Sequence, residues 1–525
     1  MDDLGWAEVG YHNQVARAAG DIKTPNLDKL VEDGLEIDRF YTEKICSPSR
    51  SSLQSGRFGI HVNVQNVFPE LTNLDDPVGG YQGIPVNMTG MAEILRDRGY
   101  ATKAVGKWDV GMATEYHSPK SRGYDYWFGY WHHSNDYWQF DEGTCDGVVT
   151  RDLWRINETY NAPVPEYQNG PSCAQDNQFP ADEACVYEED ILFNEVVDII
   201  KTHDSSTPLF LFYSMHLVHM PLQVIKAALD EFSFIDNRFR QEMHAMVNAM
   251  DIYIGGVVAA LQESGLWEDT LLVVHGDNGG ELLAELCGGN NWPLRGGKFS
   301  HFEGGIRVPA VVSGGYLPEK RRGQKEEALI SIADWYATYA HLSGASDADV
   351  MDTKAASAGL PAVDSVNCWG VISGEKKSCR SEIVIGETSA IAYNLDGDAL
   401  VGAIIREDYY KVLLGPSNQR YLVGQDVLTG PIFPNNTLPI VVPVLNPRVC
   451  DRTPENGCLF NVLSDPGESN NLASEMPELF YELLARMDEV QETVYSPKRG
   501  HKDSAACEVA SQNGYYWGPF LEPVF

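Results

Sequence analysis

The first two-thirds of the chain alternate short apolar runs with amphipathic segments. The apolar runs, which predict strands, are 35–41, 101–105, 208–214 and 270–275, and the amphipathic segments, which predict helices, are 91–98 and 240–263. Another helix begins at Pro25, because Thr24 is a favourable N-cap and proline fits the first turn, and it ends at Gly34. Strands that alternate with helices predict an α/β fold, with a large mixed, mainly parallel sheet flanked by helices.

The pattern changes after the first 380 residues. The stretches that predict antiparallel strands begin at Glu382, Leu400 and Tyr409, and the segment that predicts one amphipathic helix is 476–494. The loop-rich stretch 343–377 is the expected boundary. We therefore expect a catalytic α/β domain over 1–380 and a smaller C-terminal domain over 381–525, built from an antiparallel sheet plus a helix.

Composition narrows the class of protein. The chain has 525 residues and a formal net charge of −36. A charge of this sign excludes a general nucleic-acid binder. It also repels anionic substrates at long range, so any anion site in this chain must be locally basic. We see no apolar run long enough to cross a bilayer and expect no transmembrane segment.

Cysteines and glycosylation acceptors indicate the compartment. The sequence has ten cysteines, including the short-spaced pairs Cys173/Cys185 and Cys450/Cys458. The three acceptor triplets begin at Asn87, Asn157 and Asn435. Together they predict an oxidising secretory compartment, and hence a secreted or lysosomal protein. If Cys46 is set aside for chemistry, nine cysteines remain, so at least one is unpaired. The sequence alone does not give the pairing.

Residues suited to chemistry follow the predicted strands directly. They are Cys46 after 35–41, Lys107 after 101–105, His216 and His219 after 208–214, and Asp277 and Asn278 after 270–275. Open α/β sheets bind ligands outside the carboxyl ends of their strands. We therefore expect these side chains to meet at one edge of the sheet.

The segment Cys46-Ser-Pro-Ser-Arg50, continuing to Gly56-Arg57, resembles the signature of the sulfatase family. The resemblance implies that a dedicated formylglycine-generating enzyme oxidises Cys46 to formylglycine. One hydroxyl of the aldehyde hydrate attacks sulfur and the other later expels sulfate. Pro48 is expected to start a helix whose amide dipoles favour an anion, and Arg50 adds a fixed charge. The alternative interpretation is a structural or disulfide cysteine beside a helix start.

Two further segments resemble the metal-binding pairs of the same family. Asp2-Asp3 matches the N-terminal carboxylate pair, and Asp277-Asn278 the second pair. With the formylglycine oxygen at Cys46, these groups form a cage of hard oxygen ligands, which suits Ca²⁺, or Mg²⁺, better than zinc. Taken singly, Asp277-Asn-Gly-Gly is more often a turn, and Asp2-Asp3 a cap or solvated surface.

The resemblance also assigns the remaining catalytic residues. Lys107 is implied to bind sulfate, and Lys298 to neutralise or protonate the leaving oxygen. His219 is implied to act on the substrate side; the alternative is a packed loop residue. Asp109 stands where the family has a histidine that accepts a proton when sulfate is expelled. A carboxylate can accept a proton but repels sulfate, so we expect slow or absent turnover. Asp109 could offset this by pairing with Lys107 or binding the metal.

The resemblance covers essentially the whole chain and implies an alkaline phosphatase-like fold. It is closest to the arylsulfatase B group, through segments such as Asn290-Asn-Trp-Pro-Leu-Arg295. The predicted function is therefore hydrolysis of sulfate esters on a sulfated sugar such as N-acetylgalactosamine 4-sulfate, or of an aryl sulfate. Two alternatives stay open: a phosphodiester or phosphonate hydrolase of the same fold, and a sulfatase-fold protein that binds sulfated glycans without turnover.

The start of the chain also departs from the family. The sequence opens Met1-Asp2-Asp3, with no signal peptide before it. In the family an apolar central strand leads directly into the aspartate pair. We therefore expect the written start to be truncated and the sheet to have a slot where this strand belongs.

Overall fold

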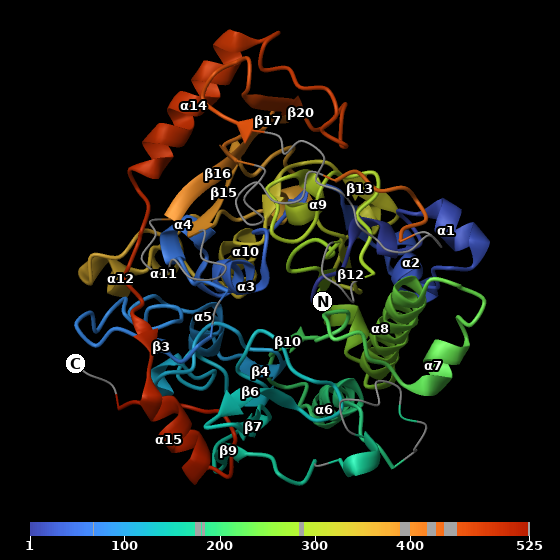
Figure 1. Ribbon diagram of the computed structural model, residues 1–525, viewed down its shortest axis with the longest axis vertical. Coiled ribbons are helices and arrows are strands. Elements are labelled where there is room, and N and C mark those ends of the chain that lie inside the picture. The colour runs from blue at the N-terminus through green and yellow to red at the C-terminus, as the bar shows by residue number, and fades with distance from the viewer. Residues whose placement is uncertain are drawn as a thin grey trace.

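Two sheets lie side by side in the computed structural model (Figure 1), which describes residues 1–66, 68–167, 169–173, 180, 184–282, 288–388, 399–416, 427–434 and 449–522. The first has the order β10 (Leu209–Ser214), β4 (Ala101–Gly106), β5 (Tyr126–Gly129), β8 (Trp154–Ile156), β9 (Asn161–Pro163). The second has the order β11 (Leu272–His275), β12 (Ala310–Ser313), β1 (Leu35–Ile37), β13 (Gln324–Glu326). The pairs β10–β4, β4–β5 and β1–β13 are parallel and the others antiparallel. The mixed α/β class is confirmed.

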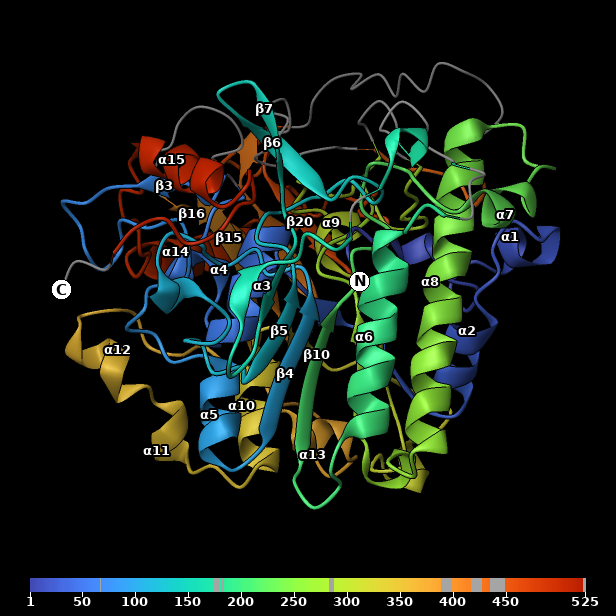
Figure 2. The ribbon, with the colours of Figure 1, turned by 90° about the horizontal axis from the view of Figure 1, so that it is seen from below.

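Helices cover both faces of the first sheet (Figure 2). They are α6 (Glu188–Thr202) and α8 (Arg238–Glu263) on one side, and α3 (Cys46–Ser55), α5 (Met91–Asp97) and α10 (Asp334–Leu342) on the other, whereas α2 (Pro25–Glu32) packs on β12 and β1 of the second sheet. Side chains alternate between the faces of a strand. On β10, Leu211 packs in the α6 cluster, whereas Phe212 packs in the cluster that contains α5 and α10. Burial on both faces explains why β10 is apolar throughout.

Helix α8 is long, with 26 residues, and strongly apolar. By length and composition alone it is long and apolar enough to cross a membrane, which the sequence analysis did not anticipate. However, 67% of that apolar window is buried inside the protein. The helix contacts α2, α6 and α7 (Lys226–Asp230), so its apolar side chains form core.

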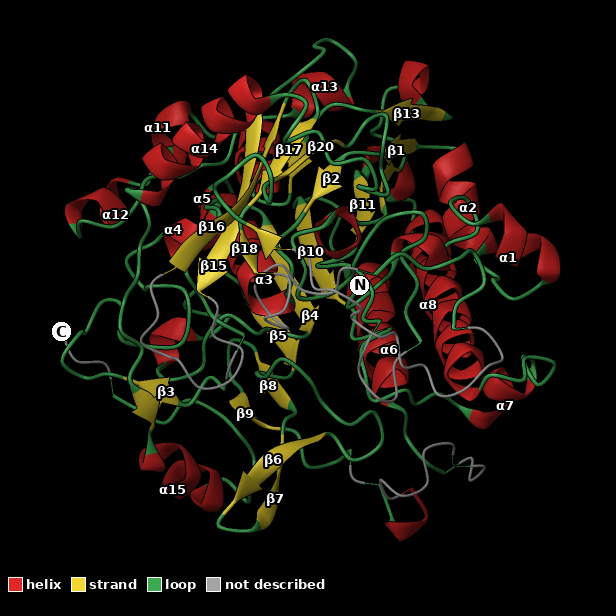
Figure 3. Cartoon of the chain, turned by 45° about the horizontal axis from the view of Figure 1, so that its top comes forward, coloured by secondary structure: helices red, strands yellow, loops and turns green. Residues whose placement is uncertain are grey.

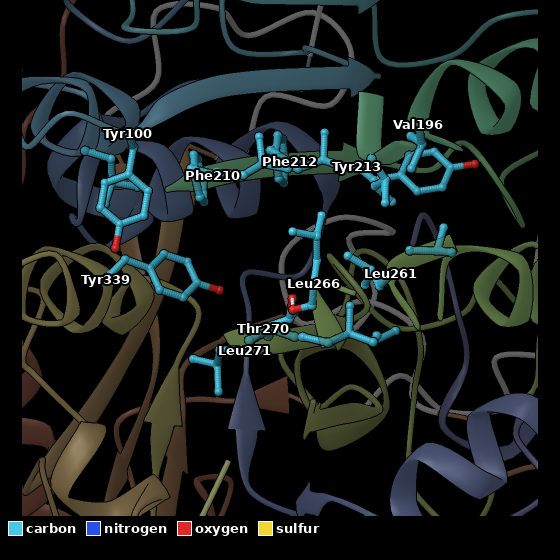
Figure 4. A pocket seen from close by; sticks show the side chains of 18 of the residues that line it. Tyr100, Val196, Phe210, Phe212, Tyr213, Leu261, Leu266, Thr270, Leu271 and Tyr339 are labelled. Atoms are coloured by element: carbon cyan, nitrogen blue, oxygen red, sulfur yellow. Dashed lines mark hydrogen bonds between the residues drawn. The ribbon is translucent and has the colours of Figure 1, made fainter. Parts of the chain in front are cut away.

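A cavity of about 930 Å³ separates β10 from β11, and side chains of both strands line it (Figure 4). Each strand pairs on one edge only, and most of their side chains are half-buried. Met1 lies at one end: its amino group donates to His275 O at 3.0 Å and its carbonyl accepts from Asp277 N at 3.1 Å, the pattern of a parallel ladder.

The C-terminal region contains an antiparallel sheet, as its pattern predicts. Its order is β15 (Glu382–Thr388), β16 (Ala399–Arg406), β17 (Tyr410–Leu413), β20 (Cys458–Asn461), and α14 (Pro477–Gln491) packs on it through Leu483, Leu484 and Met487. The final segment returns to the first region, where β21 (His501–Lys502) pairs with β3 (Leu71–Thr72) and Cys507 is bonded to Cys145. Strand pairing and a disulfide therefore join the end of the chain to the region that holds β3 and Cys145.

The smaller elements complete the chain (Figure 3). They are α1 (Gln14–Ala19), β2 (Phe40–Tyr41), α4 (Gly59–Val62), β6 (Asp141–Cys145), β7 (Val148–Arg151), α9 (Glu303–Ile306), β14 (Ile330–Ser331), α11 (Asp347–Val350), α12 (Thr353–Ser357), α13 (Trp369–Ile372), β18 (Gly415–Pro416), β19 (Val449–Cys450) and α15 (Ser504–Gln512). The single strand predicted over 35–41 is two strands, because β1 pairs with β12 and β13 whereas β2 pairs with β14.

Four disulfides join Cys145–Cys507, Cys173–Cys185, Cys368–Cys379 and Cys450–Cys458. Cys46 is the free cysteine among the residues that the structure describes. Cys287 and the acceptor Asn435 lie outside these residues. Within each short-spaced pair noted in the sequence, the two cysteines thus form a disulfide with one another. Within the described part of the chain, Cys46 is in no disulfide and is therefore available for chemistry.

A buried histidine should make stability depend on pH. His132 lies 2.7 Å from Asp152 and 3.5 Å from Glu70. Burial alone lowers the pKa of this imidazole, but the two carboxylates outweigh it and raise the pKa to about 10. Because this pKa exceeds the unfolded value of about 6.5, the contribution is complete below pH 6.5 and is lost as pH rises through about 10.

We expect His132→Gln to lower the free energy of unfolding by about 3 kcal/mol at pH 6, since it leaves the buried Asp152 carboxylate without its charged partner, whereas Glu70 keeps its ion pair with Lys502. The difference between wild type and variant should shrink from pH 6.5 to 10, measured by urea unfolding. A difference that stays constant over this range would contradict the assignment.

Candidate active site

Cys46 lies at the first residue of α3 and is completely buried. Its Sγ donates to Asp2 Oδ1 at 3.5 Å. Burial and the Asp2 carboxylate outweigh the nearby lysines and raise the pKa of the thiol well above its usual range. The unmodified side chain is therefore a neutral thiol rather than a thiolate nucleophile.

Arg50 follows one turn later on the same face of α3. Its guanidinium contacts Asp277 Oδ2 at 2.7 Å and Asp2 Oδ2 at 3.3 Å, and it donates to Ser214 Oγ at the end of β10. One side chain thus joins the N-terminal segment, the ends of β10 and β11, and the helix that carries Cys46.

Three buried carboxylates meet beside Cys46. Asp3 N donates to Asp277 Oδ1 at 3.2 Å, and Asn278 Nδ2 donates to Asp3 Oδ1 at 2.7 Å. Burial, followed by mutual repulsion, raises the pKa values of Asp3 and Asp277. Asp2 differs: burial opposes its ionisation, but Lys107 and other cations hold its pKa well below the usual range. A cation among these groups would relieve the repulsion.

The ligand atoms that lie within 4.8 Å of one another belong to Asp2, Asp3, Cys46 and His219. Asp277 contacts Asp3 but lies outside this group, and Asn278 contacts Asp3 through its amide. Asn278 Oδ1 is buried without a hydrogen-bond partner, so rotation of this amide would offer one more oxygen ligand. Carboxylate and amide oxygens are the ligands that Ca²⁺ and Mg²⁺ prefer, so the residues present fit such an ion.

Lys107 is held at the end of β4 by its backbone. Gly106 has φ +96°, and a Cβ there would lie 2.1 Å from Ser214 O, so only glycine allows this close approach. Lys107 N then donates to Ser214 O at 3.1 Å, and Nζ donates to Asp2 Oδ2 at 2.7 Å. Burial opposes its charge, but Asp2 together with the other nearby acids raises the pKa of Lys107 above its usual value. Lys107 is therefore a permanent cation.

Asp109 lies beside Lys107 and Ser47. Its Oδ1 accepts from Ser47 Oγ at 2.8 Å, and its Oδ2 lies 3.6 Å from Lys107 Nζ. Burial raises the pKa of this carboxyl, while Lys107 partly offsets the effect. Of the two arrangements considered from the sequence, the structure has the one in which Asp109 neighbours Lys107 rather than joining the group of metal-ligand atoms.

His219 and Lys298 form a pair on the other side of Cys46. His219 Nδ1 lies 2.6 Å from Met220 O, so this nitrogen carries the proton and Nε2 accepts from Lys298 Nζ at 3.1 Å. Lys298 Nζ also donates to Asp3 Oδ2 at 2.7 Å. Burial and Lys298 hold the pKa of His219 well below its usual range. Burial opposes the charge of Lys298, but Asp3 together with the other nearby acids raises that pKa well above the usual range. Lys298 is thus the proton carrier of the pair.

Comparisons with known proteins agree with this geometry. A sequence profile described as Sulfatase matches residues 1–345. The chain is 30% identical over 534 residues to mouse arylsulfatase J, covering 99% of this chain and 79% of that protein. This chain belongs to the sulfatase family. Like its arylsulfatase relatives, it is a sulfuric ester hydrolase.

More distant relatives support the same placement. The sulfatase is 29% identical over 347 residues to human N-acetylgalactosamine-6-sulfatase, covering 66% of this chain and 61% of that protein. Its fold is similar to that of Ps i-CgsB, solved in complex with k-i-k-neocarrahexaose, with a TM-score of 0.68, 23% identity, and coverage of 98% of this chain and 96% of that one. The alkaline phosphatase-like fold expected from the sequence is therefore confirmed.

The sequence did not single out several residues that hold this site. Ser47 and Asn66 contact each other at 3.0 Å beside Asp109, and Ser214 binds Arg50. His216 is paired with the buried Glu188 at 2.6 Å. The rule that functional residues follow strands identified His216 in the sequence. The same rule could have identified Ser214, which lies at the end of β10. Glu188 begins an amphipathic helix, and nothing in its local pattern distinguishes it from a solvated first-turn acid.

Proposed function

We propose that this sulfatase hydrolyses sulfate esters of a sulfated sugar, using a formylglycine formed at Cys46 and a bound Ca²⁺. The observation that carries the proposal is the meeting of Cys46 with Asp2, Asp3 and His219, whose ligand atoms lie within 4.8 Å of one another. Three cations surround this group: Arg50, Lys107 and Lys298. When bound, a divalent cation would polarise the sulfate and lower the pKa of the nucleophile.

Charge balance supports a requirement for metal. The cations Arg50, Lys107 and Lys298 contact the carboxylates of Asp2, Asp3 and Asp277, so the two sets neutralise each other. Asp109 adds a further acid. Without another cation the site lacks the positive charge that a sulfate group needs in a protein of net charge −36. A divalent ion among Asp2, Asp3, Asp277, Asn278 and position 46 supplies it.

The remaining residues have distinct roles in the proposal. Lys298, which is protonated and held by Asp3 and His219, supplies the proton or the charge for the departing oxygen. His219 is neutral, so it orients Lys298 and accepts a hydrogen bond rather than acting as an acid. Asp109 is the group placed to accept a proton near Ser47. Lys107 binds the sulfate and balances the Asp109 charge.

The proposed sugar is a sulfated N-acetylgalactosamine, with the 4-sulfate implied by the resemblance to the arylsulfatase B group. Similarity to N-acetylgalactosamine-6-sulfatase makes the 6-sulfate the natural comparison substrate. Four disulfides and the acceptors Asn87 and Asn157 support a secreted or lysosomal location.

The experiment uses protein made in a eukaryotic secretory host. Rates on an aryl sulfate and the matching aryl phosphate are compared, followed by the 4- and 6-sulfates of N-acetylgalactosamine. We expect hydrolysis of the sulfate esters with little activity on the phosphate. Faster hydrolysis of the phosphate would favour the phosphoester alternative, and binding of the sulfated sugars without release of sulfate would favour the glycan-binding alternative.

Removal of divalent cations should abolish activity. We expect EDTA to reduce aryl sulfate hydrolysis at least about 100-fold, since the three carboxylates then lose their common counterion. Ca²⁺ should restore the rate, and Mg²⁺ should restore it less, because Mg²⁺ demands a more regular octahedron of ligands. Full activity after EDTA treatment and dialysis would contradict the metal role.

A further inference from the structure

We propose that Asn291 is a positioning residue that holds three ligand-bearing and catalytic segments in register around the cation. The inference rests on the proposed function, because it concerns the cation cage described above. Asn291 is completely buried, and among the described residues its side chain hydrogen-bonds to backbone groups of Trp6, Gly280 and Gly296 rather than to Cys46 or a predicted ligand. Its effect must therefore pass through the backbone that it binds.

The side chain of Asn291 makes four hydrogen bonds to three segments. Its Oδ1 accepts from Trp6 N at 3.3 Å and from Gly280 N at 3.0 Å. Its Nδ2 donates to Gly280 O at 2.9 Å and to Gly296 O at 3.1 Å. An amide has two donors and two acceptor lone pairs, so every hydrogen-bonding position of this side chain is used.

Each bonded backbone group lies two or three residues from a predicted site residue. Trp6 follows Asp3, Gly280 follows Asn278, and Gly296 precedes Lys298. Lys298 N also donates to Gly280 O at 3.1 Å, so the lysine segment and the Asp277 segment are joined directly beside the amide. Asn291 therefore links the residues that provide both ligand pairs and the proton carrier.

Glycines on all three segments let the backbones approach this amide. A Cβ at Gly297 would lie 2.5 Å from Gly280 O and 2.8 Å from Asn291 Nδ2. A Cβ at Gly280 would lie 2.9 Å from Gly5 Cα. Real Cβ atoms do not approach this closely, so the three segments pack around the amide only because side chains are missing there. The hydrogen bonds and the glycines of these segments are therefore both consistent with a single amide, that of Asn291, at the centre of their packing.

The chain provides a matched control in the neighbouring Asn290. This residue is also buried and also makes four side-chain hydrogen bonds, to Trp292 N, Thr429 Oγ1, Gly430 O and Pro431 O. Of these partners, Trp292 belongs to the segment of Lys298 but lies six residues before that lysine, and the other three lie in 429–431, which carries no predicted site residue. The same substitution at the two positions therefore removes the same two N–H donors, but at Asn290 the lost contacts lie farther along the chain from the predicted site residues.

The experiment measures cation binding without turnover. Metal-free wild type, Asn291→Asp and Asn290→Asp are titrated with Tb³⁺, followed by luminescence, and Ca²⁺ competition gives its Kd. An added carboxylate by itself strengthens cation binding. In Asn291→Asp, however, the two donated hydrogen bonds are lost and the carboxylate repels two carbonyls. We expect Ca²⁺ binding to weaken about 10- to 100-fold in Asn291→Asp and to change less than 3-fold in Asn290→Asp.

Two results separate the failure of this inference from that of the proposed function. Wild type that binds neither Tb³⁺ nor Ca²⁺ would overturn the cage itself and the inference with it. Wild-type binding with equal or tighter binding in Asn291→Asp would overturn the positioning role alone. If Asn291→Asp does not fold, Asn291→Ala replaces it and Asn290→Ala becomes its control. Equal changes in Kd for the two alanine variants would then overturn the positioning role.

Discussion

Replacing Cys46 with alanine is expected to reduce sulfate-ester hydrolysis by at least about 10⁴-fold, as loss of a covalent nucleophile does in other hydrolases. Cys46 is buried at the start of α3, and its Sγ donates to Asp2 Oδ1 at 3.5 Å. The substitution removes one sulfur atom, so the free energy of unfolding should fall by no more than about 1–2 kcal/mol. Turnover of an aryl sulfate and the thermal unfolding midpoint are the measurements.

Ser51→Ala is the matched control. Ser51 is buried in the same helix, but its hydroxyl donates only to Pro48 O within the helix, at 2.8 Å. We expect this variant to retain activity within about 3-fold. A Cys46→Ala protein with wild-type turnover, or a Ser51→Ala protein as inactive as Cys46→Ala, would contradict the assignment of the nucleophile.

Replacing Asp109 with histidine is expected to raise turnover by about 10²-fold, the usual contribution of a general base. Asp109 is buried next to Lys107 and Ser47, and its charge faces the region that must accept an anion. In a site of low dielectric such repulsion can cost several kcal/mol. Asp109 has φ +55°, a conformation in which histidine, like aspartate and asparagine, is comparatively frequent, so the backbone should tolerate the change.

The variant Asp109→Asn separates the effect of the negative charge of Asp109 on substrate binding from its effect as a general base. It removes the negative charge but cannot accept a proton as a base, so we expect KM to fall without a rise in kcat. The histidine variant should raise kcat. If wild type turns over rapidly and Asp109→His slows it, then Asp109 is an adapted base and the expectation of impaired turnover is wrong.

Local patterns predicted the elements that carry the site. The helix from Pro25, the strand at 101–105 and the strand at 208–214 appear within one or two residues as α2, β4 and β10. Their signals were strong because caps and continuous apolar runs are local properties of the sequence. Placement of chemistry after strands likewise predicted that Lys107 and Asp277 lie at one site, although β4 and β11 belong to two different sheets and the two side chains are linked through Asp2 and Arg50.

Long-range partners could not be predicted in this way. The strand at 35–41 divides in two because its halves pair with strands almost 300 residues later. The polar network around Asn291 joins Gly280 and Gly296 to Trp6, which lies 285 residues before Asn291 in the chain, and no local pattern reveals this contact. The neutrality of His219 follows from burial and from Lys298, both consequences of tertiary structure. The motif predicted that His219 belongs to the site but not its protonation.

The most direct test of the central claim is the mass of the peptide that contains position 46. Protein made in a eukaryotic secretory host is digested, and the peptide is examined before and after reaction with an aldehyde-specific hydrazide. The account predicts formylglycine at position 46 and a hydrazone after the reaction. An unmodified cysteine, or a cysteine in a disulfide, in protein that nevertheless hydrolyses sulfate esters would contradict it.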